Sequence, residues 1–151
     1  LLLLLSQIWG QHDSVAKKLQ ILQNKALRII TFHPRRTSAT PLFKDCNILK
    51  LGDQIRLQNF LYAHDSVRGN LPTALSGKLS FVDSVHNTRN EMYFQLEKIQ
   101  SNTILYGTNS IKSKSVEFWN EINRLFFHEN LYEKSRAFCK KFVTKLLIDR
   151  Y

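Results

Sequence analysis

The sequence predicts a mostly α protein, an irregular helical domain of about five to seven helices. The 151 residues include only five glycines and three prolines, too few for a turn-rich β-sandwich. Hydrophobic residues make up 43% of the chain, which excludes global disorder. Apolar residues recur at helical spacing in several segments. Because a chain of this length can bury a hydrophobic core, we expect residues 1–151 to form a single helical domain.

Local signals place the individual helices. Asp13 or Ser14 can cap a helix that ends near Thr31, because Pro34 makes its continuation unfavourable. Thr40 and Pro41 predict the N-cap and first position of a short helix over residues 42–45. Further helices are expected over residues 53–69, 110–122 and 133–148.

The helix expected over residues 13–31 has two faces at about 100° per residue. One arc is apolar and consists of Val15, Leu19, Leu22, Ala26, Ile29 and Ile30. A separate arc is basic and consists of Lys17, Lys18, Lys25 and Arg28. The last helix repeats this division, with Phe138, Phe142 and Leu146 on one stripe and Lys134, Lys141 and Lys145 on another. In both helices we expect the apolar stripe to face a core.

Residues 78–108 show the weakest periodicity. Residues 92–99 alternate imperfectly, which predicts either a short β-hairpin or an extended arm in the middle of the chain. The neighbouring polar cluster His86-Asn87-Thr88-Arg89 is expected in a loop, where His86 and Arg89 can contact phosphate. The alternative is that these side chains bond to the backbone and fix the loop.

Phe118, Trp119 and Asn120 follow one another in a predicted helix. Such aromatic residues can offer a stacking surface for single-stranded nucleic acid. We favour the alternative that Trp119 is a core anchor and that Asn120 bonds to a neighbouring backbone. Trp9 is interpreted in the same way.

The charge balance suggests a polyanionic partner. The net charge is +10 and the pI is near 9.8, which favours nucleic acid first and an anionic membrane second. The alternative is a merely basic protein with solvated helix faces. The candidate nucleic-acid-binding residues are Lys17, Lys18, Lys25, Arg28, Arg35, Arg36 and Arg89. RNA or DNA is thus the expected partner, with neither a membrane nor a small-molecule ligand.

The chain carries no recognisable catalytic constellation. None of the sequence motifs for a nucleotide-binding loop, an activated nucleophile or a zinc protease occurs. We interpret residues 63–66, Ala-His-Asp-Ser, as a solvated helix end rather than a nucleophile or metal site. Cys46 and Cys139 lack zinc-ligand spacing and are expected to be reduced thiols. We expect no catalytic residue, cofactor or metal.

The N-terminal run of five leucines is too short for a signal-peptide core or a membrane span. A chain that begins without Met in an apolar run indicates a fragment. We therefore expect residues 1–9 to be the tail of a truncated upstream helix.

Five segments in a characteristic order carry a family resemblance. They are Ile8-Trp9-Gly10, Leu22-Gln23-Asn24-Lys25-Ala26-Leu27-Arg28-Ile29-Ile30, Thr40-Pro41-Leu42-Phe43 with Asn47-Ile48-Leu49, His86-Asn87-Thr88-Arg89, and Phe118-Trp119-Asn120. In order and spacing they resemble the region C-terminal to the polymerase core in reverse transcriptases of jockey-type non-LTR (LINE-like) retrotransposons. The resemblance covers nearly the whole chain.

This resemblance implies an RNA-directed DNA polymerase as the parent protein, with a Phe/Tyr-Ala-Asp-Asp motif and a separate endonuclease domain. Neither the motif nor the endonuclease domain is present here. Residues 63–66, Ala-His-Asp-Ser, are not the motif, because the aromatic residue is missing and Ser66 stands in place of the second Asp. The resemblance thus implies a non-catalytic C-terminal (post-thumb) piece that helps to bind template RNA or target DNA. The alternative is a structural module that braces the polymerase thumb without touching nucleic acid. The upstream polymerase domain would be a partner, and the location cytoplasmic and nuclear.

Overall fold

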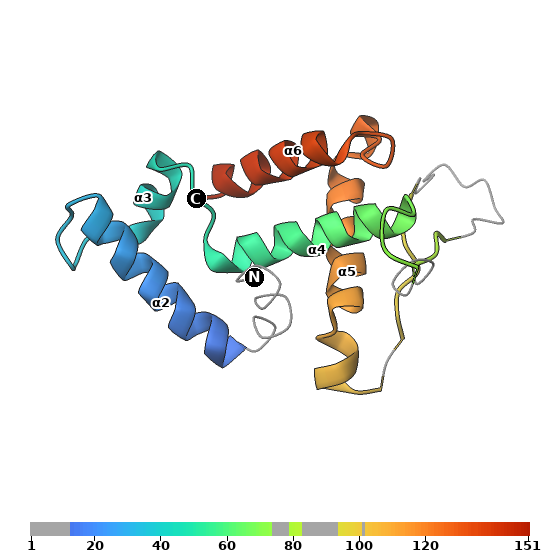
Figure 1. Ribbon diagram of the computed structural model, residues 1–151, viewed down its shortest axis with the longest axis horizontal. Helices are drawn as coiled ribbons and strands as arrows, with labels where there is room; N and C mark the ends of the chain where they lie inside the picture. Colours follow the sequence, from blue (N-terminus) through green and yellow to red (C-terminus); the bar gives the residue numbers. More distant parts are fainter. Residues whose placement is uncertain (1–12, 74–78, 83–93, 101) are drawn as a thin grey trace. The chain divides into compact units, whose positions relative to one another are not determined.

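The computed structural model of the protein describes residues 13–73, 79–82, 94–100 and 102–151 (Figure 1). These residues form five α-helices, which are α2 (Asp13–Ile30), α3 (Ala39–Asp45), α4 (Leu51–Val67), α5 (Ile111–Leu125) and α6 (Arg136–Asp149). A π-helix (Ile104–Thr108) precedes α5 and a short 3-10 helix (Phe127–Glu129) follows it. The prediction of a mostly α fold is confirmed.

Extended chain is paired at one point in the described residues, an isolated antiparallel bridge between Phe81 and Leu96. The Val82 N–H donates to the Gln95 carbonyl at 2.9 Å on one side of this bridge. The described part of residues 92–99 is thus an extended arm rather than a regular hairpin. Met92 and Tyr93 lie outside the described residues.

The chain divides into two compact units. Unit 1 comprises Leu1–Leu57 and Lys140–Tyr151, and unit 2 comprises Gln58–Cys139. The predictions for residues 1–9 and for the polar cluster at residues 86–89 lie outside the described residues. The single-domain expectation stays a prediction.

In unit 1, α2 packs against α3 around a small apolar cluster. Leu27 meets Ala39, Leu42 and Phe43 there, and Tyr151 packs against the same cluster. Figure 1 accordingly shows the C-terminus beside α3.

The apolar arc predicted for α2 is not its buried face, so this prediction is wrong. Leu22 is 58% exposed and Ile29 is 74% exposed, whereas Leu27 is only 4% exposed. The rest of the predicted arc is exposed as well, namely Val15, Leu19, Ala26 and Ile30. Leu27 lies about 100° around the helix from the middle of that arc.

Two glutamines explain this rotation. The Leu51 N–H, at the start of α4, donates to Gln20 Oε1 at 2.9 Å and to Gln23 Oε1 at 3.0 Å. Gln23 Nε2 in turn donates to the Leu49 carbonyl at 2.9 Å. The first N–H groups of a helix have no partner within that helix. The amide side of α2 therefore turns inward to satisfy one of them, and α4 begins two residues before the predicted Asp53.

Two other helix starts differ from the predictions. The N-cap of α3 is Ser38 rather than Thr40, so Pro41 is the third helical residue. Proline is tolerated there because N–H groups of the first turn lack helical partners. Helix α6 begins at Arg136, where the Ser135 hydroxyl accepts from the Phe138 N–H at 3.3 Å. That cap places the start three residues later than expected.

The buried stripe of α6 is also displaced by one residue from the predicted one. Cys139, Val143 and Leu147 are fully buried, whereas Phe138 is exposed. The predicted neighbours Phe142 and Leu146 are only half-buried. Because two adjacent rows of this helix are apolar, periodicity alone does not choose between them.

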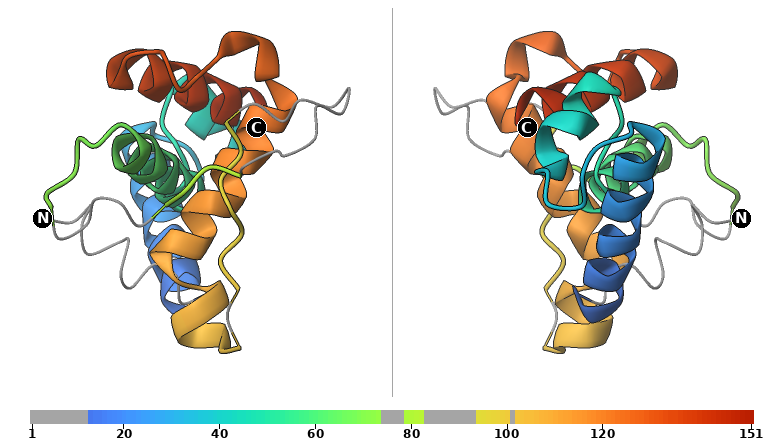
Figure 2. Two further views of the ribbon diagram at one scale, coloured as in Figure 1. Left: turned by 90° about the vertical axis from the view of Figure 1, so that its right-hand side faces the viewer. Right: turned by 90° about the vertical axis from the view of Figure 1, so that its left-hand side faces the viewer.

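Unit 2 is organised around Trp119, which is fully buried. Its ring stacks on Phe60 with centroids 5.0 Å apart, and its indole N–H donates to the Phe94 carbonyl at 2.7 Å. The side-chain amide of Asn120 forms two hydrogen bonds with the backbone of Leu96, as a neighbouring strand would. Its Nδ2 donates to the Leu96 carbonyl and its Oδ1 accepts from the Leu96 N–H, both at 2.8 Å. Figure 2 shows this segment running alongside α5. The core interpretation of both residues is confirmed, and a buried Trp119 is not a stacking surface.

The orientation of α2 can be tested with two matched substitutions on the same helix. We expect Leu27→Ala to lower the free energy of unfolding by about 2–4 kcal/mol, because it empties a buried site. Leu22→Ala removes an exposed side chain and should cost less than about 1 kcal/mol. Urea unfolding followed by far-UV circular dichroism measures both. A larger loss from Leu22→Ala than from Leu27→Ala would mean that the predicted arc is the buried face, and equal losses would contradict the orientation described here.

Candidate nucleic-acid interface

Three lysines of α2 lie exposed on its basic arc, Lys17, Lys18 and Lys25. None of them forms an ion pair or hydrogen bond with another described residue. From Lys17 to Lys25 the helix rises about 12 Å. Since one strand of a duplex carries a phosphate about every 3.4 Å of its axis, this face matches several successive phosphates.

The turn after α2 adds two exposed cations, Arg35 and Arg36. The Thr37 N–H donates to the Pro34 carbonyl at 3.0 Å, and Arg28 Nε donates to the Thr37 carbonyl at 2.8 Å. Arg28 is half-buried and so fastens the turn to α2, while its terminal amino groups make no hydrogen bond within the described residues. We define the α2 basic surface as Lys17, Lys18, Lys25, Arg28, Arg35 and Arg36.

The structure brings six of the seven candidate residues into this surface of unit 1. The seventh, Arg89, lies outside the described residues. Its predicted contact with phosphate stays a prediction.

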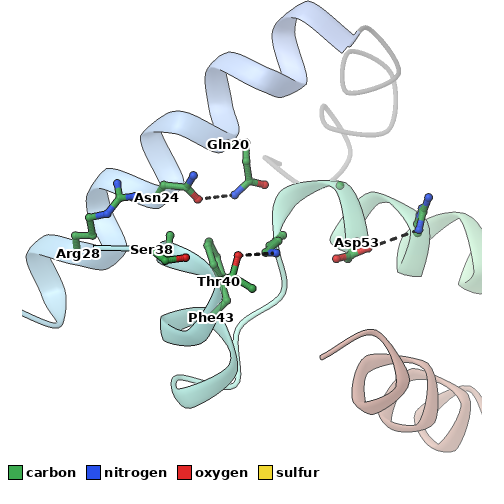
Figure 3. A pocket seen from close by; sticks show the side chains of 11 residues that line it. Gln20, Asn24, Arg28, Ser38, Thr40, Phe43 and Asp53 are labelled. Atoms are coloured by element: carbon green, nitrogen blue, oxygen red, sulfur yellow. Dashed lines mark hydrogen bonds and ion pairs between the residues drawn. The ribbon is translucent and has the colours of Figure 1, made fainter. Parts of the chain in front are cut away.

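Arg28 also lines an open cleft of about 590 Å³ within unit 1 (Figure 3). Most of the side chains that line this cleft are polar, and its other cations are Lys50 and Arg56. The lining also holds the carboxylate of Asp53, whose Oδ1 lies 3.9 Å from Arg56 Nη1. Because Arg28 belongs to both features, the cleft continues the α2 basic surface, and its cations can hold an anionic group.

Tyr151 forms hydrogen bonds with two residues that line the cleft, Lys50 and Asp53. The Tyr151 hydroxyl donates to Asp53 Oδ2 and accepts from the Lys50 N–H, both at 2.8 Å. Lys50 Nζ lies 4.4 Å from the centre of the Tyr151 ring and donates to Thr40 Oγ1 at 3.2 Å. Burial raises the pKa of Tyr151, and the Asp53 carboxylate raises it further. The phenol therefore remains a hydrogen-bond donor at neutral pH.

Sequence reasoning missed Lys50 and Arg56. They lie more than twenty positions from Arg28, and long-range docking of α2 onto the start of α4 brings them to the cleft. Nothing in their local sequence signals this. The glutamines that do the docking, Gln20 and Gln23, resemble ordinary solvated helix residues in the sequence.

The segment 63–66 of unit 2 is buried, so the prediction of a solvated helix end is wrong. His64 is fully buried, and its Nε2 lies 3.1 Å from the Lys134 carbonyl. Asp65 accepts from Arg136 Nε at 2.8 Å, and the Arg68 guanidinium donates to Lys134 O at 2.7 Å. These bonds tie the end of α4 to the start of α6. None of these side chains lines the cleft of unit 1.

The two cysteines lie in different surroundings. Both are free, Cys46 exposed and Cys139 fully buried. Burial raises the pKa of Cys139 to about 11, so it stays a thiol at neutral pH. Within the described residues, no group of three His, Cys, Asp or Glu is placed to hold a metal ion. Among the described helices, none is both long and apolar enough to cross a bilayer.

The Tyr151 hydroxyl can be tested by Tyr151→Phe, which removes the acceptor for the Lys50 N–H and the donor to Asp53 Oδ2. We expect a loss of about 2 kcal/mol at pH 7 in urea unfolding. Because the pKa of Tyr151 is raised on folding, its contribution is complete below about pH 10 and is lost as pH rises further. The difference between the two proteins should therefore shrink in strong alkali.

Tyr62→Phe is the control, because the Tyr62 hydroxyl makes no hydrogen bond within the described residues. That variant should change the free energy of unfolding by less than about 0.5 kcal/mol at pH 7. A Tyr151→Phe variant as stable as the parent would contradict the bridging role of the hydroxyl.

Comparison with known proteins gives no assignment. No family model, no curated protein and no solved structure matches the chain. The resemblance to jockey-type reverse transcriptases thus stays a prediction carried by the motifs in the sequence.

Proposed function

We propose that this chain is a non-catalytic C-terminal region of a jockey-type non-LTR retrotransposon reverse transcriptase. In this proposal it binds template RNA or target DNA through the α2 basic surface. The order of the sequence motifs supports the parentage. The observation that carries the binding role is the exposure of five cations, Lys17, Lys18, Lys25, Arg35 and Arg36, which have no carboxylate partner among the described residues.

Cations of this kind bind phosphates by displacing condensed counterions, which needs charge and reach rather than exact spacing. An unpaired lysine or arginine gives up no internal salt bridge when it meets a phosphate. The cleft beside Arg28 adds Lys50 and also Arg56, whose Nη1 lies 3.9 Å from Asp53 Oδ1. Such a surface recognises the nucleic-acid backbone and supplies affinity without sequence preference.

A salt titration tests this proposal. With about five phosphate contacts, the logarithm of the binding constant should fall with the logarithm of salt concentration with a slope of roughly −3 to −5. Changing Lys17, Lys18 and Lys25 together to Gln should reduce the size of that slope by about 2 to 3. Fluorescence anisotropy with labelled RNA or DNA measures both proteins.

The matched control changes Lys140, Lys141 and Lys145 of α6 to Gln. These lysines are also exposed, so the control loses the same charge at another place. It should reduce binding much less than the α2 triple variant. Equal reductions would exclude α2 as the binding surface, and no binding by the intact chain at low salt would refute the proposal as a whole.

A second function is favoured by the exposed apolar arc of α2. In this alternative the chain braces the thumb of the upstream polymerase domain, and Leu22 and Ile29 are part of the contact. Apolar side chains gathered on one exposed helix face are typical of a protein contact. The neighbouring lysines would then be merely solvated.

Thiol labelling tests whether the exposed apolar arc of α2 contacts the upstream domain. In a Cys46→Ser background, Leu22→Cys should react quickly in the isolated chain, because position 22 is exposed. It should be protected in a longer product that includes the upstream coding sequence. Lys17→Cys, on the basic arc, is the control and should stay reactive in both. If position 22 stays equally reactive in the longer product, the bracing function is wrong.

A further inference from the structure

Helix α2 ends at an unusual residue, Phe32. The Phe32 N–H donates to the Ile29 carbonyl at 3.2 Å, and the His33 N–H donates to the Arg28 carbonyl at 2.9 Å. This pair of bonds is the Schellman ending of a helix, which places one residue in the left-handed region. Phe32 occupies that position with φ 54°.

The same ending recurs after α3 and α4, where the left-handed residues are Asn47 and Gly69. Glycine and asparagine are the residues that normally take this position. A bulky side chain there is an outlier, because its Cβ is crowded by the backbone. Of the three helix ends, only that of α2 carries a residue unsuited to its conformation.

Burial does not explain the choice of phenylalanine. Phe32 is 96% exposed, so its ring gains no packing that would offset the strain. Glycine would adopt the left-handed backbone conformation with less strain, and a polar side chain would interact more favourably with water at this exposed position. Strain that folding does not require is a hint of function.

The surroundings of Phe32 indicate which function. Its helix end leads directly into the turn that presents Arg35 and Arg36, and Arg28 fastens that turn to α2. His33 Nδ1 also lies 2.8 Å from the Thr31 carbonyl. An exposed aromatic ring is therefore followed, three and four positions later, by two exposed arginines on a turn held by its own hydrogen bonds. Single-stranded nucleic acid is bound by this combination of a stacking ring and nearby cations.

We propose that Phe32 is a stacking platform for an unpaired base of single-stranded nucleic acid, whose flanking phosphates contact Arg35 and Arg36. This inference rests on the proposed function and adds a preference for single strands. In a duplex each base is already stacked between its neighbours and offers only its edges in the grooves. An unpaired base of either RNA or DNA offers its face, so both share the required chemistry.

The proposal can be tested by measuring how tightly the full chain binds a labelled single strand of about 16 nucleotides. The strand is used both as RNA and as DNA, and a duplex of the same sequence serves for comparison. Phe32→Gly should weaken binding to the single strand by roughly 5- to 100-fold. The salt slope should stay unchanged, because no charge is removed. Duplex binding should also stay unchanged. The RNA and DNA arms show which strand is bound more tightly.

The stability of the variants separates binding from folding. Phe32→Gly should raise the melting temperature, because glycine relieves the left-handed strain, while it lowers affinity for the single strand. Phe32→Tyr should keep full affinity. Ile30→Ala, which removes another exposed side chain two residues away, should leave binding unchanged.

Two outcomes would overturn the stacking role while leaving nucleic-acid binding in place. One is a Phe32→Gly variant that binds the single strand as the parent does. The other is a Phe32→Leu variant with full affinity, since leucine is apolar but has no ring to stack. If the parent chain binds neither single strand nor duplex at low salt, the proposed function fails with it.

Discussion

The hydrogen bonds from Gln20 and Gln23 to the start of α4 fix how α2 is rotated about its axis. Each bond contributes only about 1 kcal/mol, but an unsatisfied Leu51 N–H would cost about 1–3 kcal/mol. With the amides inward, Leu27 reaches the core, and the apolar and basic arcs both face outward. Burial of one large apolar side chain contributes about 1.5–3 kcal/mol. Burial of the exposed apolar arc against a partner would therefore contribute favourable free energy to binding.

A second constraint is the way in which the chain leaves its helices. Asn47 and Gly69 end α3 and α4 with residues suited to a left-handed backbone, whereas Phe32 ends α2 against that preference. The preference for glycine or asparagine at the left-handed residue is thus followed at two of these three helix ends and broken at one. Such local departures are expected at functional sites. The broken rule falls beside Arg35 and Arg36, where the structure also gathers unpaired positive charge.

The sequence predicted what depends on local chemistry and periodicity. The helical fold class followed from composition and spacing, and Trp119 and Asn120 took the predicted roles of core anchor and backbone partner. The predictions failed where a distant group decided the outcome. The apolar arc of α2 was misassigned because the acceptors for Leu51 N–H come from side chains about thirty positions earlier, at Gln20 and Gln23. Likewise, Asp65 is held by Arg136, a pairing that local sequence does not reveal.

The two functions considered for α2 do not compete for the same surface. At about 100° per residue, the inward side around Leu27, the apolar arc around Val15 and the lysine arc lie roughly 120° apart. One helix can therefore pack on its own unit, dock on a protein partner and face a nucleic acid at the same time. Phe32 and the arginine turn lie past the last turn of the helix, so docking along the apolar arc leaves them open. The three faces of α2 therefore differ in chemistry as well as direction, since one is amide-lined and packed, one is apolar and exposed, and one is basic and exposed.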